Sequence, residues 1–403
     1  MQNKNEKRVP ELRFKGFVDD WEQRKLGEVA SIFDGTHQTP HYTESGVMFL
    51  SVENIKTLQS EKYISMENFE GEFKVRPEYG DVLMTRIGDI GTANVVRTNT
   101  QIAYYVSLAL LKAIDTDSDF LAISIASPFV QKGLWMRTLH IAFPKKINKN
   151  EIEKVDIIVP RKEEQQKIGK FFTNLDHLIA LHKRKLDLLK QMKQGYLQQM
   201  FPKNGEKVPK LRFANFEGDW EERKLGELGK VFTGNTPSTT DKENWSSNNK
   251  GYIWITPTDI NKLLISNSER CLTDKGWSKA RTVPANSVLI TSIASIGKNA
   301  INIVPAAFNQ QINAIVPKEN ASYFVLSAME KDTVRFAGIA GKTATSIISK
   351  KWFEAFKIYV PEYKEQIEVG QLFSFIDYMT SLYQQKVYNI TLQRKTYLQL
   401  IFI

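Results

Sequence analysis

The chain carries one sequence pattern twice. Residues 9–28 return as residues 208–227, and roughly two-thirds of the aligned positions are identical, far more than local composition produces. A second pair follows at nearly the same offset: residues 159–165 match residues 360–366, and each opens a long periodic segment. The chain is therefore two copies of one unit, each a globular part followed by a helix. Two similar surfaces at a separation set by helices suit the reading of two places on one long ligand.

Bulk composition limits the class of protein. At 403 residues the chain is long enough for two or three cores, and its formal net charge of +10 favours a polyanionic partner. Many proteins carry such an excess without binding nucleic acid. No apolar run approaches the roughly 18 residues of a membrane span, and the polar residues 1–8 do not resemble a signal peptide. Cys271 is the only cysteine, which excludes an intramolecular disulfide and suits the reducing cytoplasm.

The organisation is that of four blocks. Pro202 and Gly205 interrupt the chain between the two copies. We expect an α+β fold, in which two similar mixed α/β domains are joined and separated by two long antiparallel coiled-coil helices. The expected blocks are domain 1 with its framework segment (1–160), a central helix (161–201), domain 2 (202–361) and a C-terminal helix (362–403).

Both helical segments carry a heptad seam, with apolar residues at alternating steps of four and three. The first seam is Ile168, Phe172, Leu175, Ile179, His182, Leu186, Leu189, Lys193, Tyr196 and Met200. The second is Val369, Phe373, Ile376, Thr380, Tyr383, Val387, Ile390, Arg394, Tyr397 and Ile401. The basic interruption recurs at the same position, Lys193 against Arg394. It either fixes the register of the helix pair or extends its charge past the end of the seam.

The apolar stripe is wider than a two-helix seam requires. Phe171, Leu178 and Met192 flank the first seam, and Leu372 and Met379 flank the second. Either the helices pack against the globular domains or an outside helix docks there. About 38 residues at 1.5 Å each give a helix of roughly 57 Å, and the simplest pairing is intramolecular and antiparallel.

Mixed α and β signals fill the globular domains. Residues 80–91 and 286–297 alternate in hydropathy and contain glycines, which predicts a strand pair around a turn in each copy. Helices are expected over residues 119–127 and 323–329, capped by Asp119 and Ser322.

Catalytic and cofactor motifs do not emerge. His37 and His41 lie four apart, but the intervening Pro40 opposes the helix that would place them on one face for a metal. Residues 341–343 resemble the end of a phosphate-binding loop, but Phe336 stands where that loop requires its first glycine. No nucleotide fingerprint, nucleophile elbow, methyltransferase motif or nuclease carboxylate set is present. The sequence indicates a binding protein that holds no cofactor.

At this point the chain resembles the specificity (S) subunits of bacterial type I restriction–modification systems. The resemblance rests on the duplicated 9–28 and 208–227 segments and on the Pro-x-x-x-Glu-Gln helix openings at 160–165 and 361–366. The loops at 35–40 and 234–238 add to it.

The resemblance implies that each domain is a target recognition domain reading one half of a split double-stranded DNA site. The helices would be the spacer that docks two methyltransferase (M) subunits, and restriction (R) subunits would join the complex. The S chain would be non-catalytic, with S-adenosylmethionine, ATP and Mg on the partner subunits, which methylate adenine and cleave DNA.

The residues themselves agree with that expectation. A pseudo-twofold protein matches the approximate dyad of duplex DNA, and the helix length limits the reach to roughly 17 base pairs at about 3.4 Å per pair. Residues 42–75 and 241–285 do not align between the copies, whereas the framework segments, residues 9–28 and 208–227, do. A common scaffold with different inserts predicts two different half-sites, and so an asymmetric target.

Candidate DNA contacts are Lys and Arg for phosphates and Arg, Asn, Gln, Ser and Thr for base edges. The candidates are Thr36, His37, Gln38, Arg86, Arg97, Lys145, Lys146, Asn235, Thr236, Lys242, Lys298, Gln310, Gln311, Lys342, Lys350 and Lys351. For each, the alternative is an ordinary solvated side chain. Trp245 either packs against a sugar or base or belongs to a core.

Candidate partner-binding residues lie on the helices and the framework. They are Phe171, Leu178, Met192, Leu372, Met379, Trp21 and Trp220, the two tryptophans being either structural or partner-facing. The basic rows 183–185 and 394–395 could join them or simply be solvated.

Two other classes of function stay open. One is an enzyme, such as a nuclease or fused methyltransferase, which the missing motifs disfavour. The other is a coiled-coil protein scaffold without specific DNA readout. A steep dependence of DNA affinity on salt would exclude the scaffold.

Overall fold

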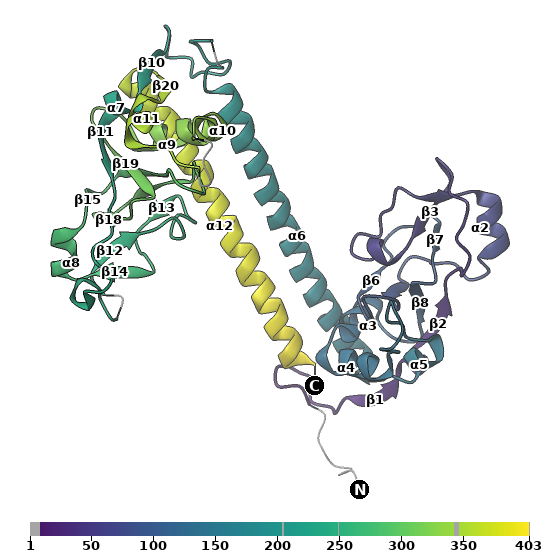
Figure 1. Cartoon of the computed structure of the whole chain (residues 1–403). Helices are drawn as coiled ribbons and strands as arrows, with labels where there is room; N and C mark the ends of the chain where they lie inside the picture. The colour runs from purple at the N-terminus through teal and green to yellow at the C-terminus, as the bar shows by residue number, and fades with distance from the viewer. Residues whose placement is uncertain (1–8, 204, 249, 342–345, 403) are drawn as a thin grey trace. The chain divides into compact units, whose positions relative to one another are not determined.

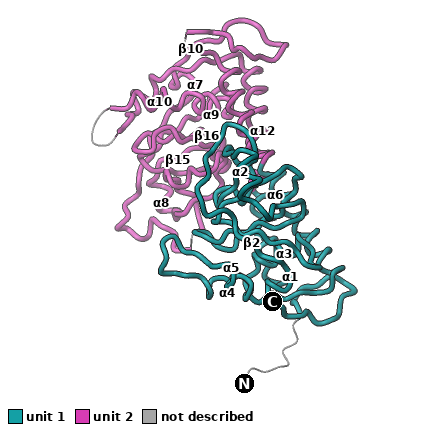
Figure 2. The backbone as a smooth tube through the Cα atoms, turned by 90° about the vertical axis from the view of Figure 1, so that its right-hand side faces the viewer, with its two compact units in different colours: residues 1–183, 385–403 teal, residues 184–384 magenta. Residues whose placement is uncertain are grey.

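The computed structural model describes residues 9–203, 205–248, 250–341 and 346–402. It divides into two compact units, residues 1–183 with 385–403 (unit 1) and residues 184–384 (unit 2), coloured separately in Figure 2. Each unit holds one globular domain and a part of both long helices, so the division cuts across the four blocks expected from the sequence. Those block boundaries stay predictions.

The described residues of unit 1 form nine short strands and several helices. Figure 1 labels most of these elements. The strands are β1 (Glu22–Lys25), β2 (Ala30–Asp34), β3 (Val47–Leu50), β4 (Tyr63–Ile64), β5 (Val82–Thr85), β6 (Ala93–Val95), β7 (Ile102–Tyr104), β8 (Leu108–Ala113) and β9 (Asp156–Val159). The helices are α1 (Leu26–Val29), η1 (Val52–Asn54), α2 (Met66–Glu72), α3 (Ser118–Ile125), α4 (Pro128–Arg137), α5 (Lys149–Glu153) and the first part of α6 (Lys162–Gln199).

The strands of unit 1 form two stacked sheets and one separate pair. The antiparallel order is β2-β8-β5-β6 in one sheet, and β4-β3-β7 with a parallel β3–β7 pair in the other, while β1 pairs with β9. Alternate residues of β5 face opposite sides, as strand geometry requires. Val82 and Met84 enter the core shared with α3 and α6, whereas Leu83 enters the core beneath β3 and β7.

Unit 2 repeats this plan with additions (Figure 1). The strands are β10 (Glu221–Lys224), β11 (Gly229–Thr233), β12 (Tyr252–Ile255), β13 (Leu264–Ile265), β14 (Arg270–Leu272), β15 (Thr282–Val283), β16 (Ser287–Thr291), β17 (Asn299–Asn302), β18 (Ala306–Phe308), β19 (Ile312–Pro317) and β20 (Lys357–Val360). The helices are the second part of α6, α7 (Leu225–Leu228), η2 (Lys242–Asn244), α8 (Asp274–Lys279), α9 (Ser322–Lys331), α10 (Thr333–Gly338), α11 (Lys350–Ala355) and the first part of α12 (Tyr363–Ile401).

Strand order in unit 2 matches that of unit 1. The order β11-β19-β16-β17 corresponds to β2-β8-β5-β6, and β14-β12-β18 corresponds to β4-β3-β7, including the parallel pair. The short strands β13 and β15 are additions on this common plan, whereas α8 follows β14 as α2 follows β4. The α+β class and the internal repeat expected from the sequence are therefore confirmed.

The strand pair expected within residues 80–91 is correct in its first strand and wrong in its second. β5 ends at Thr85, residues 86–92 form the connection, and β6 begins only at Ala93. Likewise β16 ends at Thr291 and β17 begins at Asn299. Glycines at 88, 91 and 297 have φ between +79° and +90°, so they belong to the turns rather than to a strand.

Both helix caps expected in the domains are wrong by a residue or two. Asp117, not Asp119, caps α3, because its side chain accepts a hydrogen bond from the Phe120 N–H at 2.9 Å. α9 begins with Ser322 itself, whose hydroxyl donates instead to the carbonyl of Asn286 at 2.6 Å. The helices themselves are confirmed, and Ser127 caps a further helix, α4.

The two heptad seams are confirmed as the buried stripes of α6 and α12. Every predicted seam residue is buried or half-buried. In unit 1, Phe171 contacts Tyr397 with ring centroids 5.2 Å apart; in unit 2, Phe201 contacts Phe373 at 5.8 Å. In unit 1 the early residue Asp176 of α6 pairs with the late residue Arg394 of α12. In unit 2 the late residue Lys193 of α6 pairs with the early residue Asp377 of α12, so the helices pair antiparallel.

The duplicated segments, residues 9–28 and 208–227, each form hydrogen bonds with both long helices of their unit. Arg13 donates two hydrogen bonds of 2.8 Å to Glu164 near the start of α6, and Arg212 makes the matching pair with Glu365 near the start of α12. The backbone N–H of Leu12 donates to Leu400 near the end of α12 at 2.9 Å. The framework of one repeat is thus completed by the helix end of the other repeat.

Candidate nucleic-acid interface

Four connections of unit 1 meet at one end of its sheets. Backbone hydrogen bonds join Thr36 N–H to Tyr104 (3.2 Å), Arg86 N–H to Ser107 (2.9 Å) and Ile147 N–H to Arg86 (3.0 Å). We call residues 34–38, 86–91, 105–107 and 139–147 the unit 1 loop cluster.

The same hydrogen bonds recur in unit 2. Asn235 N–H donates to Phe308 (3.0 Å), Ser292 N–H to Gln311 (2.8 Å) and Ile348 N–H to Ser292 (2.9 Å). Residues 234–238, 292–298, 309–311, 341 and 346–348 form the unit 2 loop cluster. Ser292 therefore occupies the place of Arg86, and Gln311 that of Ser107: one backbone arrangement carries different side chains in the two domains.

Most of the predicted DNA contacts fall in these two clusters. In unit 1 they are Thr36, His37, Gln38, Arg86, Lys145 and Lys146, and in unit 2 they are Asn235, Thr236, Lys298, Gln310 and Gln311. The hydroxyl of Thr236 donates to the Gln310 side chain at 2.6 Å, which joins two of them directly. None of these assignments is tested by the fold, and they stay predictions.

Arg86 is engaged inside the protein. It is 5% exposed, forms an ion pair with Asp34 of β2 and donates from Nε to the Ile147 carbonyl at 3.1 Å. Its guanidinium thus holds the 139–147 connection against the sheet. Asn235 is similarly occupied, because its side chain donates to the Lys279 carbonyl at 2.9 Å and accepts from the Arg281 N–H at 2.5 Å.

A cleft of about 430 Å³ opens at the unit 2 loop cluster. Its polar lining includes Thr256, Asp259, Glu269, Asn309 and Gln311. The Asn309 side chain donates to the Gln311 side-chain oxygen at 2.9 Å, which fixes the amide of Gln311 at the edge of the cleft. Fixed amides, hydroxyls and carboxylates are the groups that read base edges.

The remaining candidates lie outside the clusters. Arg97 is paired with Asp119 beside α3, Lys242 lies in η2, and Lys350 at the start of α11 is 3.4 Å from Glu354. Lys351 is exposed on α11. Lys342 lies outside the described residues.

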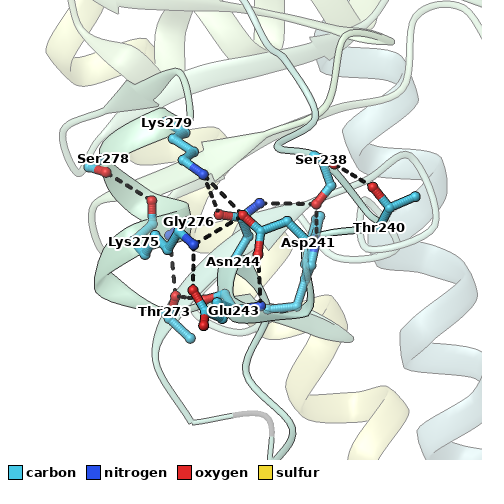
Figure 3. A network of polar contacts seen from close by, with 11 residues as sticks. Ser238, Thr240, Asp241, Glu243, Asn244, Thr273, Lys275, Gly276, Ser278 and Lys279 are labelled. Carbon is cyan, nitrogen blue, oxygen red and sulfur yellow. Dashed lines mark hydrogen bonds and ion pairs between the residues drawn. The ribbon is translucent and has the colours of Figure 1, made fainter.

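A polar network that no sequence pattern predicted joins η2 to α8 in unit 2 (Figure 3). Lys275 lies 3.2 Å from Asp241 and 2.5 Å from Glu243, and Lys279 lies 3.2 Å from Asp241. Hydrogen bonds from the two lysines lower the pKa of Asp241. The lysines of α8 are thus neutralised locally and fix η2 against α8; no spacing in the sequence signals this pairing.

Trp245 packs within unit 2. Its ring lies 4.9 Å from that of Trp254, the Arg270 guanidinium lies 3.6 Å above it, and its N–H donates to Ser238 at 3.1 Å. These contacts support the core interpretation of Trp245 over a contact with a sugar or base.

The predicted partner-binding residues are partly exposed and partly internal. Leu178 and Met192 are 40% and 38% exposed on α6, whereas Leu372 and Met379 on α12 and Phe171 on α6 are half-buried. Trp21 and Trp220 are 3% and 1% exposed, which supports their structural interpretation. Their partner-binding role stays a prediction. Lys185, from the basic row 183–185, donates to the Tyr383 hydroxyl at 3.4 Å.

The described part of the chain contains no group of three or more His, Cys, Asp or Glu that could hold a metal ion. Among the described helices, none is long and apolar enough to cross a membrane.

Comparison with known proteins decides the family. The family described as "Type I restriction modification DNA specificity domain" matches the chain twice, over residues 18–191 and 217–392. The chain belongs to this type I specificity family. The two matched segments of the specificity chain coincide with the two repeats, each with most of its long helix.

Named relatives agree with this family. The EcoR124I/EcoR124II specificity subunit of Escherichia coli is 34% identical over 192 residues, 45% of this chain and only 47% of that relative. The HindI specificity subunit of Haemophilus influenzae is 23% identical over 431 residues, 88% of this chain and 92% of the relative. The solved S subunit from M. genitalium shares the fold, with a TM-score of 0.68, 13% identity, and coverage of 98% of this chain and 99% of that one.

Proposed function

We propose that the chain is a sequence-specific double-stranded DNA-binding subunit of a type I restriction–modification complex, with each loop cluster reading one half of a split site. One observation carries the proposal: the two loop clusters share the same backbone hydrogen bonds, but their solvent-accessible positions differ, with Thr36 and His37 in one domain against Asn235 and Thr236 in the other. A constant backbone with variable side chains is what a reader of two different half-sites requires. The target is therefore asymmetric and gapped.

The long helices set the gap and dock the partners in this proposal. Exposed Leu178 and Met192 on α6, and Phe375 and Tyr388 on α12 at 60% and 66% exposure, leave apolar surface for partner helices. Two M subunits bind there and R subunits join them. The relatives named above are called specificity subunits. The chain itself is non-catalytic and acts in the cytoplasm, and S-adenosylmethionine, ATP and Mg belong to the M and R subunits.

Methylation mapping tests the proposal. The chain is co-expressed with a cognate type I methyltransferase subunit, and the host DNA is sequenced for modified adenine. We expect one asymmetric gapped motif. Exchanging one globular domain for that of a relative changes one half of the motif and leaves the other half. A soluble complex that adds no motif would contradict the recognition role.

A coiled-coil scaffold without DNA readout is the second candidate, favoured by the same exposed apolar residues on α6 and α12. Salt dependence separates the two. Phosphate contacts give a log–log slope of about −0.9 per neutralised phosphate. A complex whose DNA affinity is negligible, or insensitive to salt between 50 and 200 mM, would support the scaffold.

A further inference from the structure

The connection between α4 and α5 in unit 1 carries exposed apolar side chains at its tip, residues 141–143. Ile141 and Phe143 are fully exposed, at 100% and 104% of their reference areas, and Trp135 and Met136 at the end of α4 are 64% and 63% exposed. Isolated exposed apolar residues are ordinary, but four so close together mark a contact surface.

The tip is held firmly by the unit 1 loop cluster. Leu139 N–H donates to the Lys146 carbonyl at 2.8 Å, which closes the connection on itself, and Gly88 N–H donates to the Lys145 carbonyl at 2.8 Å. His140 donates from Nε2 to the Trp135 carbonyl at 2.9 Å, and the two rings lie 4.8 Å apart. The apolar side chains are thus presented at a fixed place among the predicted DNA contacts.

Cations flank the apolar tip. Lys145 and Lys146 are exposed and form no ion pair with any residue that the structure describes. The nearest facing loop contributes one carboxylate, Asp89, which accepts a hydrogen bond from the Thr92 hydroxyl at 2.7 Å. Paired cations beside an exposed apolar wedge complement duplex DNA, in which phosphates flank apolar base steps.

We propose that Ile141 and Phe143 form an apolar wedge that enters a base step in the half-site read by unit 1, while Lys145 and Lys146 hold the adjacent phosphates. The inference rests on the proposed function and adds to it a local distortion of the DNA. Side chains of this kind partly unstack the step that they enter, which favours flexible pyrimidine–purine steps there.

The wedge is confined to one half-site. In unit 2 the matching connection is closed by the bridge between Gly341 and Ile347, and residues 342–345 within it read Lys-Thr-Ala-Thr. That sequence offers no large apolar side chain. Distortion is therefore expected on the unit 1 side only, so the unit 2 half-site is an internal control.

The test uses the complete complex of the chain with its M subunits on duplex DNA that carries the mapped site, without S-adenosylmethionine. Permanganate reports unstacked thymines. The wild-type complex is expected to show a hyperreactive step in the unit 1 half-site, which the I141S/F143S variant loses together with about tenfold or more in affinity for the site. The F143L variant keeps the reactivity, and V18S, at an exposed apolar residue outside the cluster, changes neither.

The K145A/K146A variant measures the contribution of the two lysines independently of the apolar wedge. It is expected to reduce the log–log salt slope by up to about two, because two phosphate contacts are lost. Wild-type affinity and reactivity in I141S/F143S would overturn the wedge while leaving the proposed function intact. Loss of M-subunit association in that variant would overturn it too, by making the tip a protein contact. A wild-type complex without specific DNA binding would instead refute the proposed function.

Discussion

Lys193 of α6 donates to Asp377 of α12 across 2.7 Å, and the two side chains are only 12% and 10% exposed. Lys193 also lies 2.6 Å from Glu330 of α9, and the Tyr323 hydroxyl donates to Asp377 at 2.9 Å. The basic interruption of the seam is therefore paired inside unit 2 rather than extended into solvent. This supports a role in fixing the register of the helices, which stays a prediction.

The equivalent ion pair in unit 1 also joins a basic seam residue to an aspartate, but its side chains are more exposed to solvent. Arg394 donates to Asp176 at 2.5 Å, but the side chains are 25% and 47% exposed. Water competes for an exposed pair, so its contribution to stability is small. The two pairs thus form a matched comparison within one chain.

Replacing Lys193 by methionine is expected to lower the free energy of unfolding of unit 2 by about 3 kcal/mol, because the buried side chain of Asp377 and the half-buried side chain of Glu330 lose their cation. Hydrogen exchange of the α9 amides in the complete chain measures the change. Arg394→Met, the control, should cost under about 1 kcal/mol in unit 1. Equal effects would mean that burial does not distinguish the pairs.

The end of α12 is expected to stabilise unit 1, the domain farthest from it in sequence. Phe402 is 6% exposed and its ring lies 6.1 Å from Trp21, 5.8 Å from Phe120 and 6.1 Å from Phe172. Phe402→Ala should cost unit 1 about 3–4 kcal/mol through the cavity that it leaves. Unit-resolved proteolysis measures this loss.

Phe201 provides the control for Phe402, because it makes the equivalent contacts with Trp220, Phe324 and Phe373 in unit 2. Phe201→Ala should weaken unit 2 and spare unit 1. If both variants weaken the same unit, the exchange of helix ends between repeats is wrong.

The pairing of β1 with β9 is expected to weaken in acid. Burial raises the pKa of Asp156, but hydrogen bonds from Lys25 at 2.6 Å and Gln23 at 2.7 Å outweigh this effect, and the pKa falls below its ordinary 3.8. A carboxyl with a lowered folded-state pKa stabilises the fold above its ordinary pKa. That contribution is lost as the pH falls below 3.8 through the folded-state value.

Asp156→Asn should therefore cost unit 1 up to about 1 kcal/mol at pH 7, a small amount because the pair is partly exposed. The difference from wild type should vanish below the folded-state pKa. Denaturation at pH 7 and in steps below pH 3.8 follows the loss of this difference. A difference that is constant with pH would show that the carboxylate charge is not the cause.

The long helices could be predicted because their signal is local and repeated. Ten seam positions in each helix follow the heptad, so a single misread residue cannot hide the period. The caps failed for the opposite reason. Asp117 and Asp119 are both good capping residues two positions apart, and only the local backbone selects between them.

Side-chain pairing over long separations was beyond the sequence. Arg86 is a fair candidate for a phosphate contact until Asp34, 52 residues away, is found beside it. Trp245 could stack on a base until Arg270 is found over its ring. By contrast, the apolar residues before Lys145 and Lys146 were visible in the sequence, but their exposure depends on the tertiary fold.

Gln311 is the residue of the unit 2 loop cluster whose loss should change specificity most cleanly. Its amide is fixed by Asn309 at the edge of the cleft and its backbone carbonyl accepts from Ser292, so truncation to alanine removes a polar group without breaking the backbone contact. One lost base contact costs about 1–3 kcal/mol, so Gln311→Ala should relax one position of the unit 2 half-site by roughly tenfold to a hundredfold. Methylation mapping of the variant measures this as tolerance of other bases at that position.

The control is Lys318→Ala. Lys318 is exposed at the opposite end of β19, so its replacement removes a charge outside the cluster and should leave the motif unchanged. Relaxation in the half-site of unit 1 instead would mean that the domains do not read their half-sites separately.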